Sequence, residues 1–285
     1  MIDLHTHSSF SDGSDRPSEL VAEAARLGLS AIALTDHDTL EGIEEARRAG
    51  HRLGVEMIPG TEISCEWRRG GMHMTVLFLE PGAGPLQDRL ATLRASRDGR
   101  NALMVDRLRD LGIDITLEEV LGQAGEGTVG RPHVAAVLVR KGVVPDPATA
   151  FEELLGYGRP AYLGRERLLP KEAIALARAS GARPVLAHPH TLGLDTTAEV
   201  AELIGWLADA GLVGLECLYP GYPVEQREAL MEMARSFGLL VSGGSDYHGT
   251  YKEGIALGSG RGDLAVPDEV LETLRPVQRG PASEP

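Results

Sequence analysis

Short apolar runs recur along this chain, and most are followed by a segment of helical spacing. Alternating strand-like and helix-like segments are typical of α/β folds with a largely parallel sheet. We expect strands at 2–6, 30–35, 55–63, 72–79, 184–188, 212–218 and 239–243. We expect helices at 17–27, 39–53, 170–180, 197–210 and 223–237. Together these elements predict one domain built like a βα barrel, with a hairpin at Arg68-Arg69-Gly70-Gly71.

The alternation stops between residues 86 and 167. Helical patterns at 86–111, 116–122, 131–141 and 147–156 follow one another there, with no strand pattern between them. We therefore assign residues 1–85 and 168–265 to the barrel, 86–167 to a helical insertion domain and 266–285 to a C-terminal tail. The insertion carries twelve basic and twelve acidic residues, so the rest of the chain carries the whole net charge of −14. The insertion should therefore repel a phosphate group least.

Composition excludes several classes of protein. A net charge of −14 argues against a protein that grips long duplex nucleic acid through many phosphates. The two cysteines, Cys65 and Cys217, are isolated in sequence, as expected for reduced thiols in a cytosolic protein. No apolar run approaches the roughly 20 residues that span a bilayer. The chain opens on a strand pattern that contains the charged Asp3, so we expect no signal peptide, no membrane contact and a cytoplasmic location.

Two polar clusters stand directly after the first two apolar runs. The first contains His5, His7 and Asp12, and the second is Thr35-Asp36-His37-Asp38. The carboxyl ends of parallel strands form the rim on which α/β active sites are built. A single H-x-H is equally compatible with an ordinary polar strand end. Two clusters at equivalent positions, rich in imidazole and carboxylate, favour a metal site.

The same residue types recur where later strands should end. These residues are Glu62, His188, His190, Asp246 and His248. Imidazole and carboxylate without thiolate suit Zn, Mn or Fe, and they disfavour a closed structural zinc site. One ion does not need so many ligands, which predicts two to three divalent ions. His73 fits less well because it begins its strand, so the residues alone leave it open between a ligand and a structural histidine.

The motifs around these residues resemble the PHP (polymerase and histidinol phosphatase) superfamily. They read H-T-H-S-x-x-S-D-G, T-D-H-D-T, P-G-x-E-I-S, G-R-P-H, A-H-P and G-S-D-x-H-G, and the similarity extends from residue 1 to about residue 260. They are most similar to the branch of stand-alone nucleotide phosphoesterases and short-RNA 5′→3′ exonucleases. The resemblance implies a distorted seven-stranded βα barrel with a trinuclear metal site.

The resemblance also implies how the ligands divide among three ions. A first ion would be held by His5, His7, Glu62 and Asp246. Glu62 would bridge to a second ion, held also by His73 and His188. A third ion would be held by Asp12, His37 and His248. Asp12 stands where the histidinol-phosphatase branch usually has a histidine, which makes histidinol phosphate a less favoured substrate.

Three further residues are candidates for substrate binding. Arg131 and His133 belong to Gly130-Arg131-Pro132-His133 at a predicted helix start, where a phosphate is attracted by the helix N-terminus and by the guanidinium. An ordinary helix start with a surface arginine is the alternative, and the family resemblance favours phosphate binding. His190 should face the same side as His188, where it contacts the leaving group or only lines the rim.

Clustered divalent ions suit phosphate ester hydrolysis, because they neutralise the substrate and lower the pKa of a water to generate hydroxide. The sequence contains no P-loop and no G-x-S-x-G elbow. This disfavours a protein driven by nucleotide hydrolysis and a hydrolase with a serine nucleophile. We expect a metal-dependent phosphoesterase that acts on nucleotide phosphates, such as 3′,5′-bisphosphates, or trims short RNA from the 5′ end. Catalysis should depend on His5, His7, Glu62, Asp246 and His248. The alternatives are a histidinol-phosphate-type metabolite phosphatase and a non-catalytic PHP module.

Overall fold

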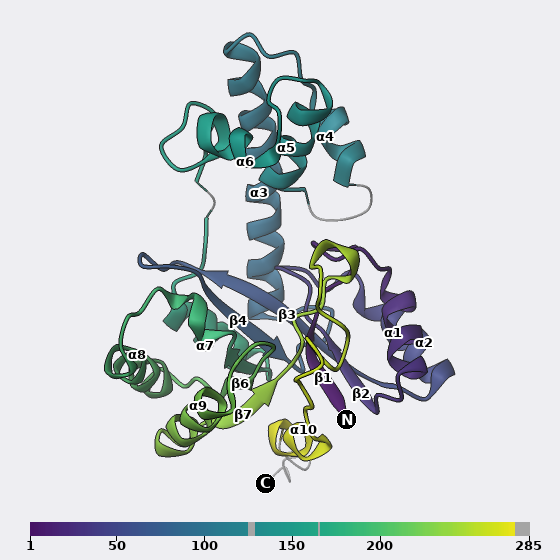
Figure 1. The fold of residues 1–285 in the computed structure, drawn as a ribbon, viewed down its shortest axis with the longest axis vertical. Coiled ribbons are helices and arrows are strands. Elements are labelled where there is room, and N and C mark those ends of the chain that lie inside the picture. Colours follow the sequence, from purple (N-terminus) through teal and green to yellow (C-terminus); the bar gives the residue numbers. More distant parts are fainter. Residues whose placement is uncertain (125–128, 165, 277–285) are drawn as a thin grey trace, which may run out of the picture. The chain divides into compact units, whose positions relative to one another are not determined.

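The computed structural model describes residues 1–124, 129–164 and 166–276. The chain divides into two compact units (Figure 1). The first comprises Met1–Asp88 and Leu168–Pro285, and the second comprises Arg89–Arg167.

The first unit contains one seven-stranded sheet in which the spatial order of the strands follows the chain. The strands are β1 (Ile2–Thr6), β2 (Ala31–Leu34), β3 (Glu56–Cys65), β4 (Met72–Leu77), β5 (Arg183–Leu186), β6 (Gly214–Leu218) and β7 (Leu240–Gly243). Strands β1 to β3 are mutually parallel, and so are β5 to β7. Strand β4 is antiparallel to β3 and β5, since the expected hairpin reverses the chain before it.

The two ends of the sheet meet through backbone hydrogen bonds. The amide of Asp246 donates to the carbonyl of His5 at 2.8 Å, and the amide of His7 donates to the carbonyl of Tyr247 at 2.9 Å. The predicted α/β class and the distorted seven-stranded barrel are therefore confirmed. The closure also brings the segment after β7 beside the segment after β1, so distant residues share one rim.

Helices cover the outside of this sheet. They are α1 (Pro17–Arg26), α2 (Ile43–Leu53), α7 (Pro170–Ala179), α8 (Thr197–Asp209), α9 (Val224–Ser236) and α10 (Asp268–Leu274), with short 3₁₀ turns at Pro189–Leu192 and Gly249–Tyr251. Helices α1 and α2 bury Leu20, Val21 and Ile43 in one cluster with Ile32 and Leu34 of β2. Apolar residues at helical spacing thus form the stripe that packs on the sheet.

The segment that the sequence pattern assigns to a C-terminal tail, 266–285, contributes to the barrel core. Helix α10 buries Val270, Leu271 and Leu274 against Ile2 and Leu4 of β1. The assignment of that segment to a tail was therefore wrong up to Leu274, because these three side chains face the sheet. The end of the segment, from residue 277, lies outside the described residues.

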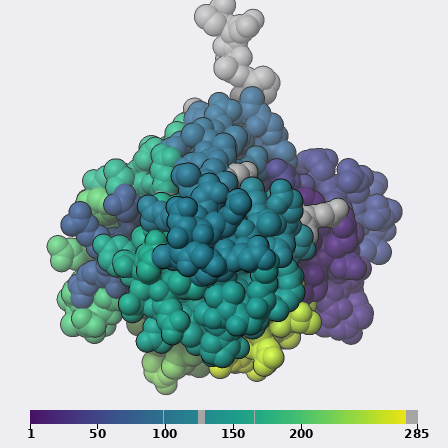
Figure 2. Space-filling model, turned by 90° about the horizontal axis from the view of Figure 1, so that it is seen from above, coloured from purple at the N-terminus to yellow at the C-terminus, as the bar shows by residue number. Residues whose placement is uncertain are grey.

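The second unit is helical throughout its described residues. It contains most of α3 (Pro85–Asp110), followed by α4 (Leu117–Ala124), α5 (Arg131–Arg140), α6 (Pro147–Ala150) and a π-helical turn, Phe151–Leu155. Met104, Leu108, Val134 and Leu138 belong to its own buried core. Figure 2 shows its atoms, in blue and teal, as a closely packed surface. Among the described helices of the whole chain, none is both long and apolar enough to cross a bilayer.

Candidate metal centre

Nine side chains predicted as ligands converge at the rim of the barrel in four overlapping groups. Within each group, one ligand atom of every member lies within 4.8 Å of the others. The groups are His7, Asp12, His37 and His248; His5, His188 and Asp246; His5, His7 and Glu62; and His37, Glu62 and His73. The shared members make this one continuous cluster.

The strand ends explain why these residues meet. His5 lies in β1 and His7 directly after it, while His37 follows β2 by three residues. Strand β3 continues past the other parallel strands, so Glu62 pairs with His37 above the end of β2. His73 starts its strand, but β4 is antiparallel, so the start of β4 lies at the same rim.

Glu62 lies at the middle of the cluster and is 1% exposed. Its Oε1 lies 2.9 Å from Nδ1 of His73 and 3.0 Å from Nε2 of His188. Its Oε2 lies 3.3 Å from Nε2 of His7 and 3.2 Å from Nδ1 of His37. One carboxylate thus contacts imidazoles from four different segments, as a bridging ligand would.

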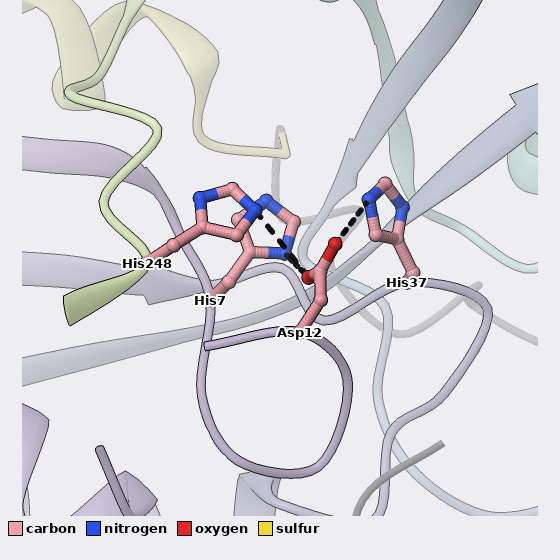
Figure 3. Close-up of side chains that lie close together, drawn as sticks. All are labelled: His7, Asp12, His37 and His248. Carbon is pink, nitrogen blue, oxygen red and sulfur yellow. Dashed lines mark ion pairs between the residues drawn. The ribbon is translucent and has the colours of Figure 1, made fainter. Parts of the chain in front are cut away.

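Asp12 and three histidines form the outer part of the cluster (Figure 3). Oδ1 of Asp12 lies 3.4 Å from Nδ1 of His7 and 3.3 Å from Nε2 of His248, while Oδ2 lies 3.5 Å from Nε2 of His37. These separations exceed ordinary hydrogen bonds. The carboxylate points between the imidazoles.

Among the described residues, three buried imidazole nitrogens in the cluster have no hydrogen-bond partner. They are Nε2 of His5, Nε2 of His7 and Nδ1 of His37. An unsatisfied buried polar atom costs about 1–3 kcal/mol, so such atoms are rare unless they serve a function. All three point at carboxylate oxygens of Glu62 or Asp246. Cations between these nitrogens and oxygens would satisfy both, so the donor set fits divalent metal ions.

Hydrogen bonds on the outer side of three rings orient their Nε2 atoms inward. Nδ1 of His5 lies 2.9 Å from Oε1 of Glu216, and Nδ1 of His248 lies 2.9 Å from the carbonyl of Asp246. Nδ1 of His188 lies 3.2 Å from Oγ1 of Thr191, whose own proton is within reach of the Gly71 carbonyl. Each Nδ1 therefore donates, which leaves the Nε2 lone pair for a metal.

The charges of the cluster shift the pKa values of its members. Burial lowers the pKa of His7, but the nearby carboxylates of Asp246, Glu62 and Asp12 outweigh this effect and raise it to about 10. Burial likewise opposes the charged form of His5, yet Glu216, Asp246 and Glu62 hold its pKa well above the usual value. For Glu62, the surrounding histidines overcome burial and hold the pKa well below its ordinary value. Without a bound cation, the imidazoles carry the positive charge that these carboxylates require.

Backbone strain is concentrated at the cluster. His188 has φ 24° and Asp246 has φ 53°, values that L-residues rarely adopt. Asp38, directly after His37, has φ 55°. Strain of this kind costs about 1–3 kcal/mol and persists where the surroundings impose it, as in functional sites.

The sequence interpretation missed Glu216. This buried carboxylate of β6 contacts Nδ1 of His5 and accepts the backbone N–H of His188 at 2.6 Å. From β6 it thereby fixes two proposed ligands, one on β1 and one after β5. The only signal was an acidic residue inside the otherwise apolar Gly214–Leu218 run.

We expect Glu216→Gln to weaken metal binding about 10- to 100-fold, the range typical for loss of a carboxylate that orients a metal-bound histidine. The amide can accept one of the two hydrogen bonds, and its NH₂ group faces the other donor. Titration with a metal-sensitive chelator would measure the change, with the exposed Glu228→Gln on α9 as control. Equal affinities for the two variants would contradict the role of Glu216.

Tyr219 and Lys252 were also missed, and both hold Asp246. Oδ2 of Asp246 accepts from the Tyr219 hydroxyl at 2.8 Å and from Nζ of Lys252 at 2.5 Å. Oδ1 of the same carboxylate faces His5 and His7 at 3.6 and 3.4 Å. The two oxygens thus have separate partners, and one oxygen is directed into the cluster.

Two further aspartates hold the loops that carry the ligands. Asp36 accepts from the amide of Ser8 at 2.7 Å and from the hydroxyl of Ser11 at 2.6 Å, which fixes the loop before Asp12. Asp3 accepts from the amide of Ser245 at 2.8 Å, directly before Asp246. Both carboxylates act through backbone and hydroxyl groups.

The three candidates for substrate binding lie outside these ligand groups. Arg131 begins α5, where it donates to the carbonyl of Leu155 at 3.3 Å and lies 5.4 Å from the ring centre of Tyr162. Nδ1 of His133 accepts from the amide of Gly130 at 3.0 Å. His190 is in the first unit, with its ring centre 6.0 Å from that of His188.

Comparison with known proteins identifies the family. The PHP domain model matches residues 3–102. A 5′-3′ exoribonuclease from Haemophilus influenzae is 35% identical over 86% of this chain and 89% of that protein. The chain belongs to the PHP family. A 3′,5′-nucleoside bisphosphate phosphatase from Chromobacterium violaceum is 31% identical over 98% of this chain and 95% of that protein.

A solved structure of a PHP relative supports the same class. A metal-dependent phosphoesterase from Bifidobacterium adolescentis superposes with a TM-score of 0.79 and 33% identity, over 96% of this chain and 94% of that one. The family resemblance read from the motifs is confirmed, as is the expectation of a metal-dependent phosphoesterase, and hence a hydrolase.

Proposed function

We propose that this PHP protein hydrolyses phosphate esters of nucleotides, such as nucleoside 3′,5′-bisphosphates, and trims short RNA from its 5′ end. The convergence of nine imidazole and carboxylate side chains at the rim of the barrel carries the proposal, because it fits the divalent ions that phosphoester hydrolysis uses. The bisphosphate phosphatase and the exoribonuclease among its relatives favour nucleotide substrates.

We propose two to three ions of Mn, Fe or Zn, shared among the ligands as the family resemblance implies. When bound, such ions neutralise the phosphate and lower the pKa of a water so that it can attack at neutral pH. The protein's residues fix the geometry. Glu216 and Thr191 orient histidine rings, while Tyr219 and Lys252 direct one oxygen of Asp246 inward.

Elemental analysis of the purified protein, combined with phosphate release from a substrate panel, tests this proposal. The panel contains a nucleoside 3′,5′-bisphosphate, a 5′-phosphorylated RNA trimer, histidinol phosphate and p-nitrophenyl phosphate. We expect two to three ions per chain and the highest kcat/KM on the two nucleotide substrates. Much faster turnover of histidinol phosphate would instead assign the protein to the metabolite phosphatases.

Arg131→Ala should reduce kcat/KM on nucleotide substrates roughly ten- to a hundredfold, because a charge-assisted phosphate contact contributes about 1.5–3 kcal/mol. Metal content should stay unchanged, since no proposed ligand lies in the second unit. Steady-state kinetics of the bisphosphate and of p-nitrophenyl phosphate would measure the effect, with the exposed Arg140→Ala on the same helix as control. A smaller loss on p-nitrophenyl phosphate would place Arg131 at a remote phosphate, whereas no loss on either substrate would refute its role.

A further inference from the structure

A pocket of about 330 Å³ lies in the first unit between helix α9 and the segment 189–200, which includes the first turn of α8. Leu194, Val200, Leu230 and Met233 form its apolar walls, and His190 lines one side. Small-molecule sites of about 300–1,000 Å³ are concave and mostly apolar, with a few polar groups for orientation. The pocket has the size and lining of a site for a small molecule.

His190 lines the pocket and also lies beside the candidate metal centre. The His190 ring lies with its centre 6.0 Å from that of His188, a proposed metal ligand, and 5.1 Å from that of Tyr219, which holds Asp246. A molecule whose phosphate reaches the metal centre could therefore extend past His190 into the pocket.

Some polar groups of the pocket already have protein partners, and others can bind a ligand. Asp195 pairs with Arg69 at 3.1 Å, and Thr196 caps α8 through its hydrogen bonds with Glu199. The half-buried Gln226 of α9 presents a side-chain amide among the apolar walls. An amide that both donates and accepts matches the edge of a nucleobase, adenine above all.

His190 is oriented by Tyr222. The Tyr222 hydroxyl lies 3.3 Å from the backbone N–H of His190, which donates to it, and 2.7 Å from Nδ1 of the ring. In the tautomer that carries its proton on Nε2, Nδ1 of His190 accepts the hydroxyl proton of Tyr222. In that tautomer, His190 offers an N–H donor beside the metal centre, where a sugar or phosphate oxygen would lie.

We propose that this pocket binds the nucleobase of the substrate, with Gln226 on the base edge and His190 donating to the sugar–phosphate. The inference rests on the proposed function, since it assumes a nucleotide substrate. It adds a base-binding site on α8 and α9, separate from the insertion residues. It also predicts a preference for adenine among nucleotides of equal phosphorylation.

Filling the pocket tests the proposal. Ala229→Trp places a large side chain in the lining at an exposed helical position, and Ala175→Trp makes the same change on the exposed face of α7 as control. The ratio of kcat/KM for adenosine 3′,5′-bisphosphate to that for p-nitrophenyl phosphate should fall about tenfold or more in Ala229→Trp, because the base loses its buried contact. The ratio should stay at the wild-type value in Ala175→Trp.

Calorimetric titration of adenosine, which has no phosphate, separates this inference from the proposed function. Adenosine should bind the wild type and Ala175→Trp, but not Ala229→Trp, and Gln226→Leu should weaken its binding more than that of uridine. If no nucleotide is hydrolysed, the proposed function fails while this titration still decides the pocket. Absence of adenosine binding to the wild type, or equal binding to both tryptophan variants, would overturn the inference.

Discussion

Glu62→Gln is expected to remove most of the bound metal and to lower phosphate release at least about a thousandfold, equivalent to about 4 kcal/mol. The change keeps the volume of the side chain and removes its charge. Both oxygens of Glu62 lie within 3.4 Å of imidazole nitrogens of proposed metal ligands. One substitution is therefore expected to affect more than one ion. Elemental analysis and steady-state kinetics would measure both losses.

Glu66→Gln provides the matched control. Glu66 follows the same strand, its side chain is exposed, and its backbone N–H donates to the carbonyl of Leu168. We expect that variant to retain its metal and its activity. Full metal content together with full activity in Glu62→Gln would refute the assignment of Glu62 as a bridging ligand.

Periodicity and strand-end position were sufficient to predict the barrel and the convergence of its polar residues. Apolar runs such as Ile2–Thr6 and Ala31–Leu34 form strands that are buried along their whole length. Because the carboxyl ends of parallel strands meet at one rim, the sequence placed His5, His37 and Asp246 together without any knowledge of distances. His73 needed the antiparallel β4 as well, and the hairpin before it was visible in the sequence.

The residues that hold the ligands could not be predicted, because their partners are remote in sequence. Glu216 lies 211 positions from His5, and Tyr219 lies 27 positions from Asp246. An isolated acidic or aromatic residue at a strand end has many possible partners. The closure of the barrel and the register of β6 against β7 decide which one it meets.

Helix α10 shows a second limit of sequence analysis. It has only seven residues, follows Pro267 and precedes a polar, proline-containing end, so its composition indicates a tail. Its three buried side chains are stabilised by the sheet and not by helix propensity, since an isolated helix of this length is unstable. Helix α10 therefore forms because of its tertiary packing against the sheet.

Acidification is expected to weaken metal binding by at least about a hundredfold between pH 8 and pH 6, because each proton displaced per ion costs a factor of ten per pH unit. In the metal-free protein, carboxylates raise the pKa of His7 to about 10, against the effect of burial, and also raise that of His5. A metal ligand must be a neutral imidazole, so binding expels these protons. The carboxylates of Glu62 and Asp246 have lowered pKa values and stay ionised over this range, so the imidazoles account for the change.

The same protons set the stability of the metal-free protein. The pKa of His7 is higher in the folded chain than the value of about 6.5 for an unfolded histidine, so its contribution is complete below pH 6.5 and is lost as the pH rises towards 10. Metal-free protein should therefore lose stability with rising pH while metal binding tightens. The difference in Tm between metal-loaded and chelator-treated protein should grow from pH 6 to pH 8. Calorimetry in two buffers of different ionisation enthalpy should show proton release on binding. A Tm difference independent of pH, with no proton release, would show that the imidazoles are already neutral before the metal binds.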